Sequence, residues 1–166
     1  MALMQLNGPA LIANLPCQWQ DEYAQSALEA SRYLAVLAEF ERENPLAEPD
    51  LSPLLSAKLD LALLWLARRP NPAPSHGAPV TLGLEEIAWH TMHALSPVQR
   101  GALVVQLSEA FPFALQLPAE VTSCQTDQTG FVIRARLQWQ NEELQDWYER
   151  TVFRYHRRDI QHRREA

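Results

Sequence analysis

Apolar residues recur at helical spacing in two stretches of the first seventy residues. Between residues 21 and 43 an apolar stripe repeats every three or four positions, which predicts an amphipathic helix. Between residues 52 and 69 a second predicted helix is apolar nearly all round. Such a helix is expected to pack on its own domain with one face and on another helix or subunit with the other. The range 21–69 is therefore predicted to be a helix pair that mediates oligomerisation.

Beyond the helix pair the hydrophobic period changes to two. A proline-rich linker is expected over 70–78. The range 79–140 then holds several short alternating segments about ten residues apart, which is typical of an antiparallel β-barrel. In the clearest of them apolar and basic side chains alternate, so that they face opposite sides of the strand. This segment contains Ile133, Arg134, Ala135 and Arg136.

The two ends of the chain complete the expected architecture. Residues 1–20 form an irregular N-terminal segment in which Ala10–Ala13 is a candidate short strand. Residues 141–166 are predicted to form a C-terminal basic helix, with an apolar inner face and arginines toward its end. The predicted fold class is α+β: a small antiparallel β-barrel with an inserted long helix pair and a C-terminal helix.

The charge and the cysteine content narrow the function classes. A net charge of −6 argues against general binding of DNA or RNA. Cys17 and Cys124 are too few for a zinc site or a disulfide framework, and we expect free thiols in a reducing compartment. The longest apolar run, 61–67, is far shorter than the ~20 residues that span a bilayer. With no signal peptide apparent, we expect a cytoplasmic protein without membrane insertion.

No pattern of catalytic chemistry emerges from the residues. The chain lacks a phosphate-binding glycine loop and a nucleophile elbow. His90 and His93 would face opposite sides of a strand, so they would not share a metal ion. Neither pair of adjacent glutamates shows a sign of the raised pKa that acid–base catalysis requires. We therefore expect no enzyme, no metal site and no cofactor.

Two pairs of arginines are the candidate binding residues. Arg134 and Arg136 are predicted to project side by side, about 7 Å apart, from the outer face of a strand. Guanidinium groups pair with phosphate through two hydrogen bonds and stack on bases, so this pair could hold an anionic nucleotide. The alternative is that both residues only occupy the solvent face. Arg68 and Arg69, at the end of the second predicted helix, could contribute to binding or could only compensate the helix dipole.

The arginines of the C-terminal helix are expected to be surface residues. Arg150 and Arg154 are predicted to pair with Asp146 and Glu149 in ordinary helix-surface contacts. The arginines near the end of the helix would compensate its dipole.

Four segments of the chain carry a family resemblance. They are Lys58–Leu64, Val80–Trp89, Leu115–Val121 and, most specifically, Glu149–Arg158. Together they resemble the atypical PilZ domains of bacterial cyclic di-GMP signalling. The resemblance implies a PilZ-like β-barrel whose long helices form dimers or tetramers, with cyclic di-GMP as the implied ligand.

The two nucleotide-binding motifs typical of PilZ domains are absent from this chain. No arginine precedes Arg32, so the motif Arg-x-x-x-Arg before the first strand is missing. The segment Leu82–Ile87 stands where Asp/Asn-x-Ser-x-x-Gly belongs. Any site for cyclic di-GMP would therefore have to be built from other residues.

These observations together predict a non-enzymatic bacterial signalling adaptor that acts by self-association and by docking to a protein partner. Cyclic di-GMP, if it binds, would contact Arg68, Arg69, Arg134 and Arg136. The alternative is a purely structural oligomerisation module that binds protein and does not bind cyclic di-GMP.

Overall fold

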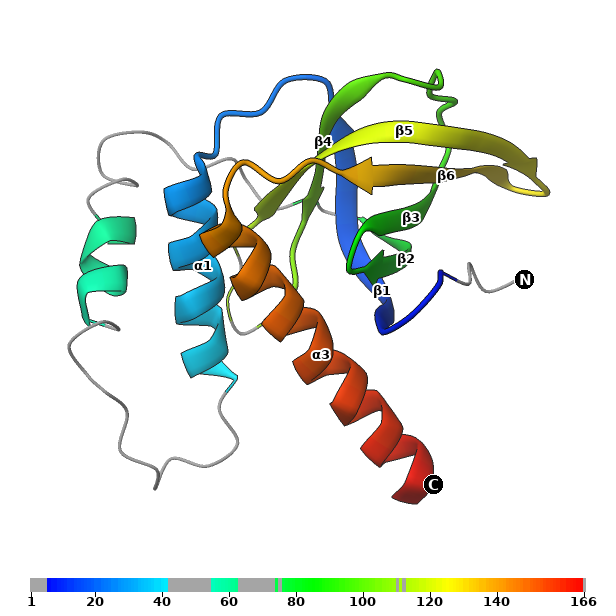
Figure 1. The fold of residues 1–166 in the computed structure, drawn as a ribbon. Coiled ribbons are helices and arrows are strands. Elements are labelled where there is room, and N and C mark those ends of the chain that lie inside the picture. Colours follow the sequence, from blue (N-terminus) through cyan, green and yellow to red (C-terminus); the bar gives the residue numbers. More distant parts are fainter. Residues whose placement is uncertain are drawn as a thin grey trace.

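Antiparallel strands close into a barrel, and helices pack together at one end of it (Figure 1). The computed structural model describes residues 6–41, 55–62, 74, 76–109, 111 and 113–165. The strands follow one another around the barrel in the order β1-β2-β3-β6-β5-β4. They are β1 (Ala10–Gln20), β2 (Gly77–Gly83), β3 (Glu86–Thr91), β4 (Arg100–Val105), β5 (Leu115–Asp127) and β6 (Gly130–Leu137). The described helices are α1 (Ala27–Phe40), a helix over 55–62, and α3 (Glu142–Glu165). The expected α+β fold, with helices inserted into a barrel and a C-terminal helix, is confirmed.

The strand that closes the barrel comes from the N-terminal segment. Residues Ala10–Pro16 of β1 pair with β2, and Cys17–Gln20 pair with β4. At the change of partner, the backbone N–H of Gln106 donates to the carbonyl oxygen of Pro16 at 3.0 Å. The strand β1 therefore extends well beyond the short strand that the hydrophobic pattern suggested. The neighbouring strand β2 begins at Gly77, inside the range expected to be linker.

The barrel interior is filled by the alternating apolar residues of its strands. Ile133 and Ala135 of β6 are fully buried. Trp89 and Ile87 of β3 lie opposite them in register and are also buried. Trp19 of β1 stacks on Trp89, with 5.4 Å between ring centroids. Aromatic pairs of this kind contribute about 0.5–1.5 kcal/mol beyond their buried area, so the stack links β1 firmly to the core.

Gly101 of β4 allows Trp19 to approach this core closely. A Cβ at residue 101 would collide with the Gln20 carbonyl oxygen and lie 2.6 Å from the Trp19 ring. We therefore expect Gly101→Ala to lower the free energy of unfolding by about 1–3 kcal/mol, the usual cost of overpacking. Gly77→Ala is the matched control, since its nearest neighbour is the side chain of Asn14. Urea denaturation followed by tryptophan fluorescence measures both variants, and equal midpoints would contradict this account.

Helix α1 begins later than the hydrophobic pattern suggested, because Ser26 caps it. The Ser26 side chain accepts a hydrogen bond from the backbone N–H of Glu29, and the spacing Ser-x-x-Glu is that of a capping box. The preceding loop crosses to β5 instead of continuing the helix. There the backbone N–H groups of Ala24 and Gln25 donate to Gln116 Oε1 at 3.0 and 2.9 Å. The buried amide of Gln116 thus fixes where the helices leave the barrel.

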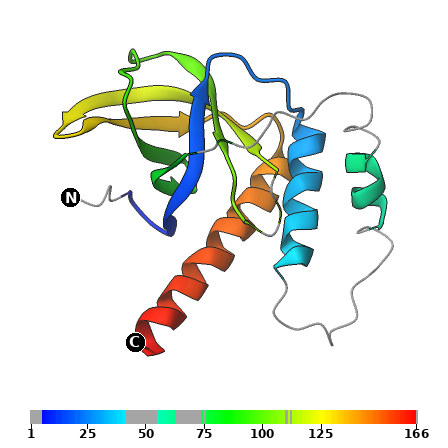
Figure 2. The ribbon, with the colours of Figure 1, turned by 180° about the vertical axis from the view of Figure 1, so that it is seen from behind.

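The helices form a layer in which α1 lies between the 55–62 helix and α3 (Figures 1 and 2). Arg32 of α1 contacts both neighbours. Its Nε lies 3.1 Å from Asp60 Oδ2, and its Nη1 lies 3.3 Å from Glu143 Oε1. Among the described helices, none is long and apolar enough to cross a membrane.

Candidate functional site

Arg136 lies in a row of alternating charges on the outer face of the barrel. In the strand register, Arg136 of β6 stands opposite Glu86 of β3 on one side and Glu120 of β5 on the other. Arg100 of β4 continues the row, with its Nε 2.7 Å from Glu120 Oε2. Opposite charges on neighbouring strands stabilise a sheet by about 0.2–1 kcal/mol per pair. The surroundings of Arg136 are therefore already rich in carboxylate.

Arg134 has different neighbours in the strand register, and both of them are small. It stands opposite Ala88 of β3 and Ser123 of β5. Beyond Ala88 the same row continues through Thr81 of β2 to Ile12 of β1. Ala88 and Thr81 are buried although they belong to the outer face, and Arg134 itself is half-buried. The two arginines of β6 thus share a face but have different neighbours in the strand register.

The other candidate residues from the sequence lie away from the outer face of β6 or outside the described residues. Arg68 and Arg69 lie outside the described residues. The ring atom Nε2 of His90 lies 3.1 Å from Thr129 Oγ1 beside the β5–β6 turn. In the described part of the chain, no group of three or more His, Cys, Asp or Glu side chains could hold a metal ion.

The 55–62 helix presents apolar side chains on two opposite sides. Ala57 and Leu61 are buried against the domain. Leu55 and Leu59, one helical turn apart, remain 59% and 55% exposed. Residues four positions apart share one helix face, so the two leucines form a continuous outward apolar stripe. In the sequence Leu51, Leu63 and Leu66 would continue this stripe, and all three lie outside the described residues.

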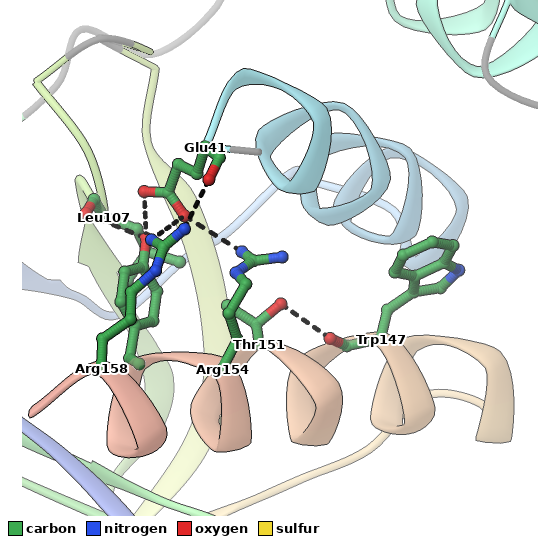
Figure 3. A network of polar contacts seen from close by, with 7 residues as sticks. Glu41, Leu107, Trp147, Thr151, Arg154 and Arg158 are labelled. Carbon is green, nitrogen blue, oxygen red and sulfur yellow. Dashed lines mark hydrogen bonds and ion pairs between the residues drawn. The ribbon is translucent and has the colours of Figure 1, made fainter. Parts of the chain in front are cut away.

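A network of polar contacts joins the end of α1 to α3 (Figure 3). At its centre Glu41, the C-cap residue of α1, accepts hydrogen bonds from Arg154 Nη2 at 3.1 Å and from the Tyr155 hydroxyl at 2.5 Å. Arg158 Nη1 lies 3.6 Å from Glu41 Oε2, and its Nη2 donates to the Glu41 carbonyl oxygen. The Tyr155 hydroxyl also lies 3.4 Å from the carbonyl oxygen of Leu107. The Glu41 carboxylate therefore joins α1 to α3, and the Tyr155 hydroxyl connects this network to the loop after β4.

The charges of this network suit their positions. Two guanidinium groups stand at the C-terminal end of α1, where the helix dipole is negative. Burial, together with the hydrogen bond to Glu41, raises the pKa of Tyr155 well above its ordinary value. Burial likewise raises the pKa of Tyr33, whose hydroxyl donates to the Phe113 carbonyl oxygen at 2.9 Å. Both phenols remain protonated, so they act as fixed hydrogen-bond donors and not as acids.

The comparisons with known proteins agree with this architecture. A family model described as "Atypical PilZ domain, cyclic di-GMP receptor" matches residues 32–165. The chain belongs to the atypical PilZ domain family. This PilZ domain is similar to a solved structure from Xanthomonas campestris, described as a tetrameric PilZ domain self-assembled via an unusual helical bundle. The two share 30% identity and a TM-score of 0.70, over 93% of this chain and 91% of that chain. The comparison with curated proteins found no match.

In this PilZ domain the role of Arg154 differs from the sequence-based expectation. Arg150 does approach Asp146, at 3.9 Å, but Arg154 turns away from its own helix to Glu41. The signal that could have indicated this is the spacing of Arg154, Tyr155 and Arg158. Positions four apart share a helix face, and two half-buried cations on one face require an acidic partner from elsewhere.

Proposed function

We propose that this atypical PilZ domain is a non-enzymatic bacterial signalling adaptor that self-associates through its helices and docks to a protein partner. The outward stripe of Leu55 and Leu59 is the observation that carries the proposal. Exposed apolar residues that form a contiguous patch mark interaction surfaces, whereas singly scattered ones are common on any protein surface. The similar Xanthomonas campestris protein is described as assembling through a helical bundle, which supports a dimer or tetramer formed through this helix layer.

We further propose that the ligand of the adaptor is cyclic di-GMP, as the description of the matching family model suggests. Its phosphodiesters are anionic, and a guanidinium offers them paired hydrogen bonds. Arg134 is the preferred contact, because the side chains of its register neighbours, Ala88 and Ser123, are small. Arg136 comes second, since the carboxylates of Glu86 and Glu120 flank it. Arg68 and Arg69 stay in the proposal on their sequence position alone.

Calorimetric titration with cyclic di-GMP tests the ligand directly. We expect saturable binding to the wild type and a loss of affinity of about tenfold or more in Arg134→Ala, the usual cost of removing a charge-assisted pair. Arg100→Ala is the matched control. Its guanidinium lies on the same outer face and its side chain is 80% exposed. An absence of heat at saturating ligand removes the receptor function, and an equal loss in Arg100→Ala removes the assignment to Arg134.

The alternative function is a structural oligomerisation module that binds only protein. The row of Glu86, Arg136, Glu120 and Arg100 favours it, because its arginines already stand next to carboxylates. Both functions belong in the cytoplasm, where the free thiols of Cys17 and Cys124 would stay reduced.

A further inference from the structure

Among the strands that the structure describes, only β6 neighbours the far half of β5. Residues Leu115–Glu120 pair with β4, whereas Ser123–Asp127 pair with β6 alone. This half belongs to the β5–β6 hairpin, which projects away from the helices (Figure 1). Among the described strands none lies along the other side of residues 122–127. Half of the backbone N–H and C=O groups of such a strand point outward and can pair with a further strand.

The usual protections of a strand edge are few here. Natural edges carry lysine, proline or inward-pointing charges that prevent pairing. The edge reads Thr122, Ser123, Cys124, Gln125, Thr126 and Asp127, so its single charge stands at the hairpin end. One bulge, between Val121 and Ser123, marks where the edge begins, and the register with β6 is regular beyond it.

A strained turn lies next to residue 121, where this edge begins. Pro97 and Val98 are the central residues of a turn closed by a hydrogen bond from Gln99 N to Ser96 O at 3.1 Å, the form of a type II turn. The third position of that turn favours glycine because φ is positive, yet here it is Val98 with φ 68°. Two backbone hydrogen bonds, at 2.8 and 2.9 Å, fix the turn to Val121 of β5.

The strain at Val98 brings no compensating burial. A β-branched residue in the left-handed region is an outlier that the surrounding structure must enforce. The Val98 side chain is 69% exposed, so it adds little to the core. A strained residue that displays an apolar side chain beside an open strand edge indicates a surface used for binding.

We propose that residues 122–127 of β5 and the side chain of Val98 form a docking site for an extended segment of a partner protein. The segment would pair antiparallel with β5 and extend the sheet by one strand. An apolar residue near its C-terminal end would pack on Val98, and a basic residue near its N-terminal end would face Asp127. The protein partner of the proposed adaptor would therefore bind by adding a strand to the sheet.

The occupant is a different chain and not a second copy, which rests on the proposed self-association through the helices. A second two-fold contact through this edge would give a closed assembly only if its axis were suitably placed relative to that of the helix contact, and would otherwise give an open one. Asp127, the single negative charge at the hairpin end, also favours a partner with a basic residue at that position. In an antiparallel pairing of two copies, Asp127 would instead lie near the uncharged Thr122 of the other copy.

Selection of a phage-displayed library of random twelve-residue peptides on the full chain tests the proposal. We expect the enriched peptides to alternate β-branched or aromatic residues with polar ones. Synthetic versions should slow amide hydrogen exchange in residues 122–127 about tenfold, while residues 131–136, already paired on both sides, stay unchanged. Enriched peptides that leave the exchange of residues 122–127 unchanged, or a selection without enrichment, would overturn the proposal.

The variant Val98→Gly separates binding from folding. Glycine relieves the strain, so the melting temperature should rise by about 2–4 °C. Affinity for the enriched peptides should nevertheless fall about tenfold, because the apolar contact is lost. Met92→Ala is the matched control, since Met92 is 70% exposed but follows the end of β3, on the opposite side of the hairpin. Unchanged affinity in Val98→Gly removes Val98 from the site.

The readouts also keep this inference apart from the proposed function. A failure of self-association appears as an unchanged mass in helix-face variants, and a failure of nucleotide binding appears as an absence of heat. A failure of edge docking appears as a selection without enrichment or as unchanged amide exchange of residues 122–127. The variant Leu55→Glu/Leu59→Glu should still bind the selected peptides, and loss of peptide binding in a folded form of it would overturn the assignment to β5.

Discussion

Replacing Glu41 with alanine should lower the free energy of unfolding by about 3 kcal/mol, because it leaves two half-buried guanidinium groups without their shared carboxylate. The Glu41 side chain is only 11% exposed and contacts Arg154, Arg158 and Tyr155 of α3. Removing one partner of such a network costs far more than the net worth of the pairs, since the remaining charges stay desolvated. Urea denaturation monitored by circular dichroism measures the loss.

The control for this prediction is an exposed ion pair on α3, the helix that carries Arg154 and Arg158. Asp146 and Arg150 are about 70% exposed and 3.9 Å apart, so Asp146→Ala should cost no more than about 0.5 kcal/mol. Glu41→Gln keeps a hydrogen-bond acceptor for Tyr155 but loses the charge. Its loss of unfolding free energy should therefore lie between those of Glu41→Ala and Asp146→Ala. A Glu41→Ala variant as stable as Asp146→Ala would show that α1 and α3 are held together by apolar packing alone.

If the protein self-associates as proposed, placing glutamates at Leu55 and Leu59 should reduce its mass to that of a single chain, 18.9 kDa. Both side chains are more than half exposed and lie on one side of the 55–62 helix, opposite the buried Ala57 and Leu61. Burying a carboxylate at an apolar interface is strongly unfavourable, so two of them per chain should prevent assembly. Light scattering coupled to size exclusion gives the mass directly.

The matched control changes charge by the same amount on the same helix. Ser56→Glu/Lys58→Gln also alters the net charge by two units, and both residues are exposed. This variant should keep the mass of the wild type. If the leucine variant also keeps that mass while remaining folded by circular dichroism, the helix layer is not the assembly surface.

Much of the barrel follows from local sequence pattern, because one face of each strand must be apolar. The alternation around Ile133 and Ala135 predicts both the strand and its buried face correctly. The predicted start of the first helix, at residue 21, is wrong, because the capping pair Ser26 and Glu29 sets the start of α1 at Ala27. The hydrophobic period alone therefore locates helices more reliably than it locates their ends.

The candidate site depends on register and on contacts between distant segments, which no local pattern contains. That Arg136 lies between Glu86 and Glu120 follows only from how β6 pairs with β3 and β5. Glu41 and Arg154 are likewise brought together by the packing of α1 against α3. Sequence could name the arginines of β6 as candidates, but it could not distinguish Arg134 from Arg136.

The strand β1 has a consequence for where this domain can be cut. The family model begins at residue 32, whereas Ala10–Gln20 supplies the strand between β2 and β4. A fragment trimmed to the matched residues would lose that strand and expose the long sides of both neighbours. Two long strand edges exposed in this way would make the fragment prone to aggregation. The smallest unit that keeps the barrel closed therefore includes residues that the family model leaves out.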